Sequence, residues 1–191
     1  MGLGERKDFE MTTQLNKHLT EIEEAMTLLD PKEVEQVVSV LEIVRKQHGT
    51  VYVCGNGGSH TTASHFVNDL VKMLHLKAVA VGDMSALVYA YGNDNGWANM
   101  FSDPIKKLIT HNDAVFGISC SGNSENVVRA LGVAKAADAL AVGLTGPSGD
   151  SEINRIGLHG LVHVFAGDIR VQEDVHLMIC HAIVRMMQEK L

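Results

Sequence analysis

Hydrophobic residues recur at helical spacing over the first fifty positions of the chain. Between residues 8 and 29 they stand three and four positions apart, which predicts an amphipathic helix. They are Met11, Leu15, Leu19, Ile22, Met26 and Leu29. Asp30 and Pro31 then mark the start of a second helix, since Asp caps free amides and Pro suits the first helical position. This helix is expected to end near His48 and Gly49. The two helices can serve as core helices or as an oligomer interface, and the sequence leaves both open.

From residue 51 onward the pattern changes to short apolar runs separated by helical segments. The runs predict strands at 51–54, 78–81, 114–118, 140–144 and 161–165. The helical segments fall at about 60–74, 97–109, 124–138 and 172–190. Alternating strands and helices predict a doubly wound α/β fold with a five-stranded parallel sheet. We therefore expect a helical extension over 1–50, with an oligomerisation role, and a single structural unit over 51–191.

Composition narrows the classes of function. Of 191 residues 46% are hydrophobic, and 23 acidic against 16 basic residues give a net charge of −7. The absence of a Lys/Arg cluster argues against a nucleic-acid or anionic-membrane surface. Three cysteines without a CxxC pair fit a reduced, cytoplasmic setting. The first residues lack the apolar segment of a signal peptide, and no apolar run approaches the roughly 20 residues of a membrane span.

The strongest candidate site is the segment Ser119-Cys120-Ser121-Gly122-Asn123-Ser124, between a predicted strand and a predicted helix. Ser119, Ser121 and Ser124 offer hydroxyl donors, and Gly122 lets consecutive amides converge. The following helix adds unpaired N–H groups and the positive end of its dipole. Such a loop binds a phosphate without Lys or Arg. The alternative is an ordinary Ser-rich turn that caps a helix.

A second glycine-rich loop, Asn56-Gly57-Gly58-Ser59, follows the first predicted strand. Its spacing matches neither a dinucleotide fingerprint nor a P-loop. The glycines permit close approach of the backbone to a ligand, while the Asn56 and Ser59 side chains can hydrogen-bond sugar hydroxyls. The alternative is a tight turn between strand and helix.

Asn93 and Asp94 lie in the segment Tyr91–Trp97, after the second strand and a short helix. Their side chains can hold a polyol. A loop with ordinary Asn/Asp turn chemistry is an equally good interpretation.

Two predicted helices carry histidine together with carboxylate. His65 and Asp69 stand four residues apart and share a helix face, which suits a divalent metal or an acid–base pair. A solvated surface pair is the alternative. In the last helix Glu173 lies about 80° from His181 around the axis, on one broad face, whereas Gln172 lies nearly opposite. His181 can equally be a histidine buried in the core.

These pieces occur together in one known family. The segments CGNGGSHTTASHFVNDL, YGNDNG, GISCSGNSENV, LTG and QEDVHLMICH resemble the sugar isomerase (SIS) domain. More narrowly, they are similar to phosphoheptose isomerases, which convert sedoheptulose 7-phosphate to D-glycero-manno-heptose 7-phosphate. The resemblance covers nearly the whole chain. It implies a zinc-type divalent metal, a small sugar-phosphate substrate, and a homotetramer with active sites between subunits and the N-terminal helices at the interface.

The resemblance also implies roles for individual residues. The substrate loop falls on Asn56, Gly57 and Gly58, with Ser59 beside it. The polyol contacts fall on Asn93 and Asp94, and the phosphate site on Ser119, Cys120, Ser121 and Ser124. The metal ligands fall on His65, Asp69 and His181, with Asp69 the proposed base and His181 the proposed acid.

Three departures from the family pattern bear on the chemistry. Asp69 replaces a Glu, which moves the carboxylate by about one C–C bond length, ~1.5 Å. Cys120 replaces a Thr. One extra residue leaves either Gln172 or Glu173 at the family's Gln position, and helix phase favours Glu173. The expected metal ligands are then His65, Asp69, Glu173 and His181, with Glu173 also a substrate contact.

The expected reaction is aldose–ketose isomerisation through an enediol. Asp69 or Glu173 would act as base and His181 as acid, with a divalent metal, zinc first, stabilising the enediolate. Two alternatives remain: a non-catalytic relative that binds a replication initiator or another regulator, and an isomerase of another phosphosugar, such as a pentose or hexosamine phosphate.

Overall fold

A five-stranded sheet forms the centre of the protein, with its strands in the order β2-β1-β3-β4-β5 and every neighbouring pair parallel. The computed structural model describes residues 3–147 and 149–190, with side chains from Thr12 onward. The strands are β1 Thr50–Gly55, β2 Lys77–Ala80, β3 Ala114–Ser119, β4 Leu140–Thr145 and β5 Gly160–His163. The doubly wound sheet predicted from the sequence is confirmed.

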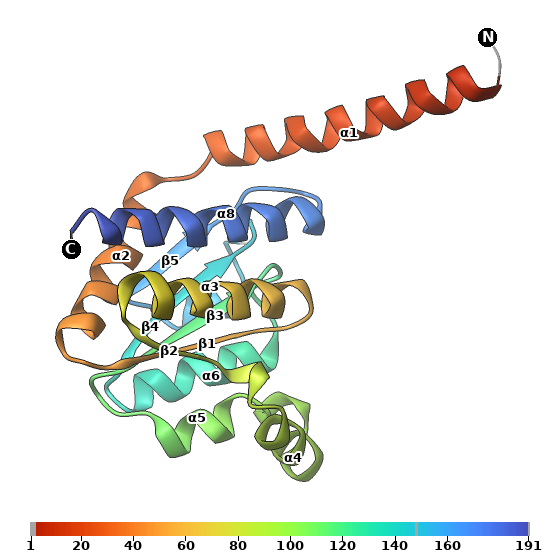
Figure 1. Cartoon of the computed structure of the whole chain (residues 1–191). Helices are drawn as coiled ribbons and strands as arrows, with labels where there is room; N and C mark the ends of the chain where they lie inside the picture. Colours follow the sequence, from red (N-terminus) through yellow and green to blue (C-terminus); the bar gives the residue numbers. More distant parts are fainter. Residues whose placement is uncertain (1–2, 148, 191) are drawn as a thin grey trace.

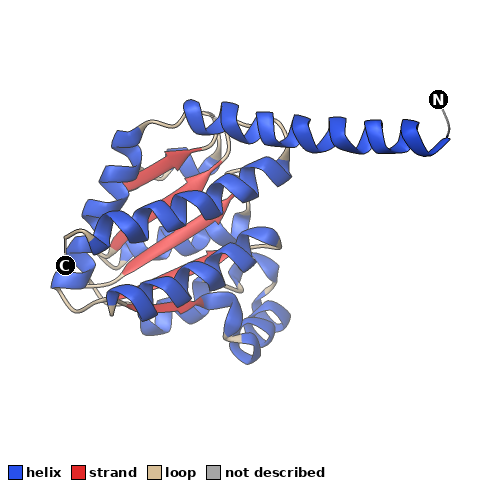
Figure 2. Cartoon of the chain, turned by 45° about the horizontal axis from the view of Figure 1, so that its top comes forward, coloured by secondary structure: helices blue, strands red, loops and turns tan. Residues whose placement is uncertain are grey.

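Helices lie on both faces of this sheet (Figures 1 and 2). They are α1 Leu3–Thr27, α2 Pro31–Lys46, α3 Gly58–Leu74, α4 Ser85–Asn95, α5 Ser102–Leu108, α6 Glu125–Ala136, α7 Glu152–Arg155 and α8 Ile169–Gln188, with 3-10 turns at Val81–Asp83 and Trp97–Asn99. Within the described part of the chain, none of them is long and apolar enough to cross a membrane.

Alternation along the strands divides the interior into two apolar cores. In β1, Val51 and Val53 join the core formed with α2, α3 and α8. The intervening Tyr52 and Cys54 join the second core, formed with α4, α5, α6 and α7. This two-sided burial explains the uninterrupted apolar runs in the sequence, because a parallel strand covered on both faces has no solvent side.

Helix α2 belongs to the body of the fold. Its Val37 and Leu41 are fully buried in the core that it shares with α3 and α8. Glu33, in its first turn, accepts hydrogen bonds from the His163 backbone amide at 2.8 Å and lies 2.8 Å from the His163 ring nitrogen Nδ1. Of the predicted extension over 1–50, only α1 therefore stands away from the sheet (Figure 1). The oligomerisation role of this segment stays a prediction.

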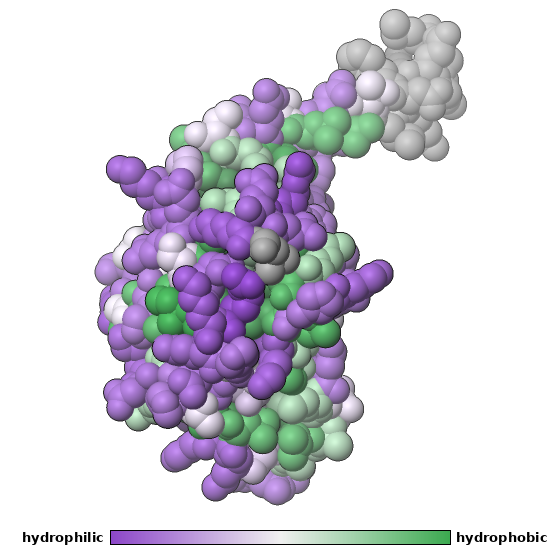
Figure 3. Space-filling view, turned by 60° about the vertical axis from the view of Figure 1, so that its left-hand side comes forward, coloured by the Kyte–Doolittle hydropathy of each residue, from purple (hydrophilic) through white to green (hydrophobic). Residues whose placement is uncertain are grey.

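Helix α1 presents apolar side chains to solvent as it leaves the body. Leu15 is 59% exposed and Leu19 54% exposed. Figure 3 shows hydrophobic residues next to the N-terminal residues drawn in grey. Met11, which begins the predicted stripe, lies outside the residues whose side chains are described. The stripe predicted from the sequence therefore includes two residues that the described part of the chain leaves more than half exposed.

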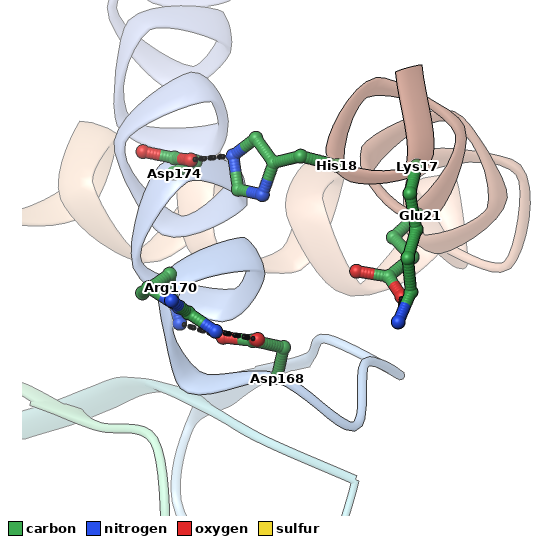
Figure 4. A network of polar contacts seen from close by, with 6 residues as sticks. All are labelled: Lys17, His18, Glu21, Asp168, Arg170 and Asp174. Carbon is green, nitrogen blue, oxygen red and sulfur yellow. Dashed lines mark hydrogen bonds and ion pairs between the residues drawn. The ribbon is translucent and has the colours of Figure 1, made fainter. Parts of the chain in front are cut away.

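A polar contact joins α1 to α8, and a second group of contacts caps the start of α8 (Figure 4). The His18 ring nitrogen Nε2 lies 2.9 Å from Asp174 Oδ2. Asp168 caps α8 by accepting from the Arg170 amide at 2.8 Å. The Arg170 guanidinium and amide that bond it hold the pKa of the Asp168 carboxyl below its usual range. Asp174 therefore bonds to His18 of α1 and not to His181, although Asp174 and His181 project from nearly the same side of α8.

The segment around the second strand differs most from the prediction. Residues Tyr91–Asn95, expected in a loop, form the last turns of α4. The helix ends at Gly96, whose φ of +84° is reached easily only by glycine. The predicted helix over 97–109 is a 3-10 turn followed by α5. The sequence signal failed here because the same Asn, Asp and Gly residues also favour turns.

Candidate active site

Two loops that follow neighbouring strands frame the candidate site. The turn from β1 into α3 holds Asn56–Ser59, and the segment from the end of β3 to the start of α6 holds Ser119–Ser124. Strands β1 and β3 pair directly, and the chain winds outward in opposite directions from them. Ligands of doubly wound sheets bind at this reversal point, beyond the carboxyl ends of the strands.

The 119–124 loop gathers hydroxyl groups in front of α6. Ser119 Oγ donates to Ser124 Oγ at 3.0 Å, and Ser121 Oγ accepts from the Asn123 amide at 3.1 Å. Ser124 occupies the position before α6, but its side chain does not cap that helix. The Ser119 and Ser124 hydroxyls therefore lie together at the start of α6, where an anion site without lysine or arginine would need them.

Gly122 gives this loop its shape. Its φ is +66°, and its amide donates to the Ser119 carbonyl at 3.0 Å. A Cβ here would lie 2.5 Å from Ser151 Oγ and 2.7 Å from Thr145 Oγ1. Both of these buried oxygens lack a hydrogen-bond partner among the described residues. The loop thus lies directly on the end of β4 and the start of α7, with no room for a side chain.

An amide pair joins the loop after β1 to the first turn of α6. Asn56 Nδ2 donates to Asn126 Oδ1 at 2.9 Å, and Asn126 Nδ2 donates back to Asn56 Oδ1 at 2.9 Å. Asn126 is buried and also accepts from the Val127 amide in the first turn of α6. Asn56, predicted to contact substrate, thereby holds the β1 loop against the start of α6, the helix that follows the β3 loop.

The first turn of α3 approaches α8 closely. Gly57 has a φ of +53° and directly precedes the helix. A Cβ on Gly58 would lie 2.3 Å from the Glu173 carboxylate carbon. The carboxylate therefore packs directly against the glycine backbone. Gln172 faces inward: its Nε2 donates to the Ala166 carbonyl at 2.7 Å. Glu173, favoured by helix phase, is the residue that reaches the first turn of α3.

Cys120 lies between the two helices. Its sulfur is 3.9 Å from Ser59 Oγ on α3 and 3.9 Å from His176 Nδ1 on α8. Burial raises the pKa of the thiol, and the nearby Glu173 carboxylate raises it further. His176 is fully buried, and its Nε2 lies 3.3 Å from the Thr145 carbonyl. Burial lowers the pKa of His176 to about 4, so the ring is neutral near pH 7.

The buried His176 predicts a pH-dependent stability. Its pKa is about 4 in the folded protein against an ordinary 6.5, so between these values the unfolded chain binds a proton that the folded chain does not. Stability should fall as the pH decreases through this window, by on the order of 3 kcal/mol in total. Denaturant unfolding at pH 7 and pH 4.5 measures it. His176→Asn should lose less stability than the wild type over the same interval, and an equal loss in both proteins would contradict the prediction.

His65, Asp69 and His181 converge between α3 and α8. Their ligand atoms all lie within 4.8 Å of one another. His65 Nε2 is 3.0 Å from His181 Nε2, and Asp69 Oδ2 is 3.5 Å from His65 Nε2 and 3.8 Å from His181 Nε2. Asp69 is only 5% exposed, so it is not a solvated surface pair with His65. His181 is exposed and therefore is not a core histidine.

Comparison with known proteins assigns this architecture to a family. Residues 14–146 match the model of the SIS domain. Phosphoheptose isomerase from Histophilus somni is 33% identical over 162 residues, which cover 82% of each chain, and that from Vibrio vulnificus is 30% identical over 93% of this chain and 97% of its own. This chain belongs to the SIS-domain family, among the phosphoheptose isomerases.

Solved structures agree with this assignment. Phosphoheptose isomerase from Neisseria gonorrhoeae superposes with a TM-score of 0.86 at 27% identity, covering 94% of this chain and 98% of that one. The enzyme from Francisella tularensis gives the same TM-score at 25% identity, covering 99% of this chain and all of the other. The SIS fold expected from the resemblance is thereby confirmed over nearly the whole chain.

Within this SIS domain the predicted site residues do not all come together. Glu173 lies outside the group formed by His65, Asp69 and His181. Asn93 and Asp94 lie exposed near the end of α4, where Asn93 Nδ2 donates to Asp94 Oδ1 at 2.9 Å. A cavity of about 190 Å³ opens beside Asn56 and Gly57, and neither Asn93 nor Asp94 lines it. Its wall includes Val88, Met100 and Phe101 of the second core and the exposed Tyr89 and Trp97.

Two residues of this SIS domain were missed by sequence reasoning. Asn126 pairs with Asn56 across 70 positions, and no local pattern signals such a contact. His176 reaches Cys120 and Thr145 from α8. His176 stands three residues after Glu173, so the two share one side of α8, and this spacing was the signal in the sequence that could have identified His176.

Proposed function

We propose that this chain catalyses the aldose–ketose isomerisation of sedoheptulose 7-phosphate to D-glycero-D-manno-heptose 7-phosphate through an enediol. The observation that carries the proposal is the convergence of buried Asp69 with His65 and His181, in a chain that also has a phosphate-type loop after β3. The purified protein, incubated with sedoheptulose 7-phosphate in deuterated water, should yield the aldose with deuterium at C2. No exchange and no aldose would refute the activity.

In such a reaction the base takes a proton from C1 while the acid protonates the carbonyl oxygen on C2. They must therefore lie within a few ångströms of each other. Asp69 Oδ2 and His181 Nε2, 3.8 Å apart, meet this condition. Glu173 lies instead at the first turn of α3. This favours Asp69 over Glu173 as the base and His181 as the acid. It also supports an enzyme over a non-catalytic relative, which has no need of this group.

The distance along α3 between the phosphate loop and the His/Asp group bears on the length of the substrate. His65 follows Ser59 by six residues, about 9 Å along the axis of α3. A sugar anchored by phosphate near Cys120 must reach along α3 and α8 to the His/Asp group. Six C–C bonds of ~1.5 Å span about 8 Å when extended, which favours an open-chain seven-carbon sugar over a pentose. A panel of ketose phosphates assayed side by side tests this preference.

We infer that the group holds a divalent metal, zinc first. Two imidazole nitrogens and a carboxylate oxygen facing one point fit the nitrogen and oxygen ligands that zinc prefers. Asn68 Nδ2 donates to Asp69 Oδ1 at 3.0 Å, which leaves the other oxygen for the ion. A bound ion would polarise the substrate oxygens. Glu173 as a fourth ligand stays a prediction.

Metal analysis gives a readout independent of activity. Elemental analysis of the purified protein should find about one zinc per chain, as three protein ligands allow. His65→Gln and His181→Gln should each lower the content several-fold, because each removes one ligand. His18→Gln, on α1 and bonded to Asp174, should leave it unchanged. Equal metal content in all four proteins would contradict this site.

Gly58→Ala tests the position of Glu173. The added methyl would displace the Glu173 carboxylate, which is the flexible end of a side chain, so folding should be little affected. If Glu173 contacts substrate or metal, turnover should fall about tenfold. Gly132→Ala, with nothing within 4 Å of its added carbon, is the matched control. Unchanged turnover in Gly58→Ala would remove Glu173 from the site.

We propose that the chain assembles into a homotetramer with active sites shared between subunits. We also propose that it works in the cytoplasm. His65 and His181 remain about half exposed in the single chain, and a groove of about 480 Å³ runs past His181 and Met178 on α8. A neighbouring subunit would cover this face and the apolar side of α1. The unpaired cysteines support a reducing compartment. Sedimentation tests the assembly, and a monomer would exclude shared sites.

A further inference from the structure

The side chain of Cys120 contacts both helices that carry the His/Asp group. Ser59 Oγ, on α3, and His176 Nδ1, on α8, each lie 3.9 Å from its sulfur. Helix α3 continues to His65 and Asp69, and α8 continues to His181. The phosphate loop therefore meets both helices at one side chain. Both partners of Cys120 are buried, Ser59 nearly and His176 fully.

The hydrogen bonds of His176 determine its tautomer. The Thr145 carbonyl, 3.3 Å from Nε2, can only accept, so Nε2 carries the hydrogen. In a neutral ring this leaves the Nδ1 lone pair facing Cys120, and the thiol donates to it. The neutral state agrees with the lowered pKa of this buried ring. His176 thus connects the end of β4, the loop after β3 and α8.

We propose that His176 is a positioning residue, which acts through Cys120 to hold the phosphate loop in register with the His/Asp group on α3 and α8. A sugar phosphate is bound at one end by this loop and reacts at the other end. Its affinity and its turnover therefore depend on the fixed separation of the two. The kinetic part of this proposal rests on the proposed isomerase function, whereas the effect on phosphate binding does not.

The contact also gives Cys120 a role within the loop. A thiol is a weak donor and is larger than a hydroxyl, so it reaches an imidazole nitrogen at 3.9 Å. A backbone bond from the Gly146 amide to the Cys120 carbonyl, at 3.0 Å, fixes the same residue to the end of β4. Both the main chain and the side chain of Cys120 are therefore bonded to neighbouring elements. Removing His176 would break the side-chain contact and leave the main-chain bond in place.

A pair of variants of matched shape separates positioning from packing. His176→Asn keeps an acceptor oxygen near the place of Nδ1, whereas His176→Leu has the same outline without one. We expect His176→Leu to raise the KM for the sugar phosphate and the Kd for inorganic phosphate about fivefold, the size of one neutral hydrogen bond. His176→Asn should return both constants to within about twofold of the wild type. Equal constants in the two variants would overturn the proposal.

Cys120→Ala is an independent test of the same contact, for use if both His176 variants fold poorly. It should raise the same two constants about fivefold, and an unchanged Kd for phosphate would overturn the proposal. In the double variant with His176→Leu the effects should not add, because both changes break one contact. Full additivity would show that the residues act separately. Should the wild type bind phosphate but fail to isomerise, the isomerase function falls and the Kd comparison still tests His176.

Discussion

Asp69→Asn is expected to lower the turnover of sedoheptulose 7-phosphate by about 10²- to 10⁴-fold, the usual contribution of a positioned general base. The amide keeps the shape of the carboxylate but cannot take a proton from carbon. Asp69 is buried, and it is the only carboxylate in the group of described residues that it forms with His65 and His181. His181→Gln should cause a comparable fall, since its ring lies 3.8 Å from the carboxylate.

Asp174→Asn is the matched control for this experiment. Asp174 is also a carboxylate facing a histidine, but its partner is His18 of α1 and it lies outside the His/Asp group. Its turnover should remain within about twofold of the wild type, as for a surface ion pair. Wild-type turnover in both Asp69→Asn and His181→Gln would show that the chemistry lies elsewhere. Asp69→Glu restores the usual family side chain and reports whether the shorter carboxylate limits the rate.

Gly122→Ala is expected to impair substrate binding through the shape of the phosphate loop. Its φ of +66° costs a side chain about 1–3 kcal/mol, and the new methyl would meet the Ser151 and Thr145 hydroxyls. The loop must open to relieve this contact, so the amides and hydroxyls that converge on phosphate separate. We expect the KM to rise at least about tenfold, with a lower free energy of unfolding.

Gly132→Ala, in α6, is the control for this substitution. It adds the same methyl where nothing lies within 4 Å, in a helix that favours alanine over glycine. It should leave the KM unchanged and raise stability by about 0.5–1 kcal/mol. Steady-state kinetics with denaturant unfolding of both variants gives the two quantities. A normal KM for Gly122→Ala would mean that the 119–124 loop does not hold the phosphate.

The acidic chain presents its candidate phosphate site without a basic cluster. Arg129, the basic side chain of α6 nearest the loop in sequence, is paired with Glu125 and Asn99. Binding must then depend on amides, hydroxyls and the start of α6, whose contributions require exact geometry rather than net charge. This dependence explains why Gly122, Asn126 and His176, which shape the loop, are the residues to test.

The sequence by itself determined the layers of the fold and the two loops of the candidate site. Apolar runs such as 114–118 indicate strands buried on both faces, and alternation with helices leaves the parallel sheet as the consistent arrangement. The position of the loops then follows from topology, because the carboxyl ends of parallel strands meet at one edge. Helix phase likewise favoured Glu173 over Gln172 for the side of the last helix that carries His181.

Only the tertiary structure decided which side chains meet across that edge. From the sequence Asp69 fits a metal ligand or a solvated surface carboxylate, and the structure buries it where α8 packs on α3. Asn93 and Asp94 read as loop residues and lie at the end of α4. Asn126 and His176 reach their partners across 70 and 56 positions. Such contacts depend on how helices pack on the sheet, and periodicity within one element carries no information about the element opposite.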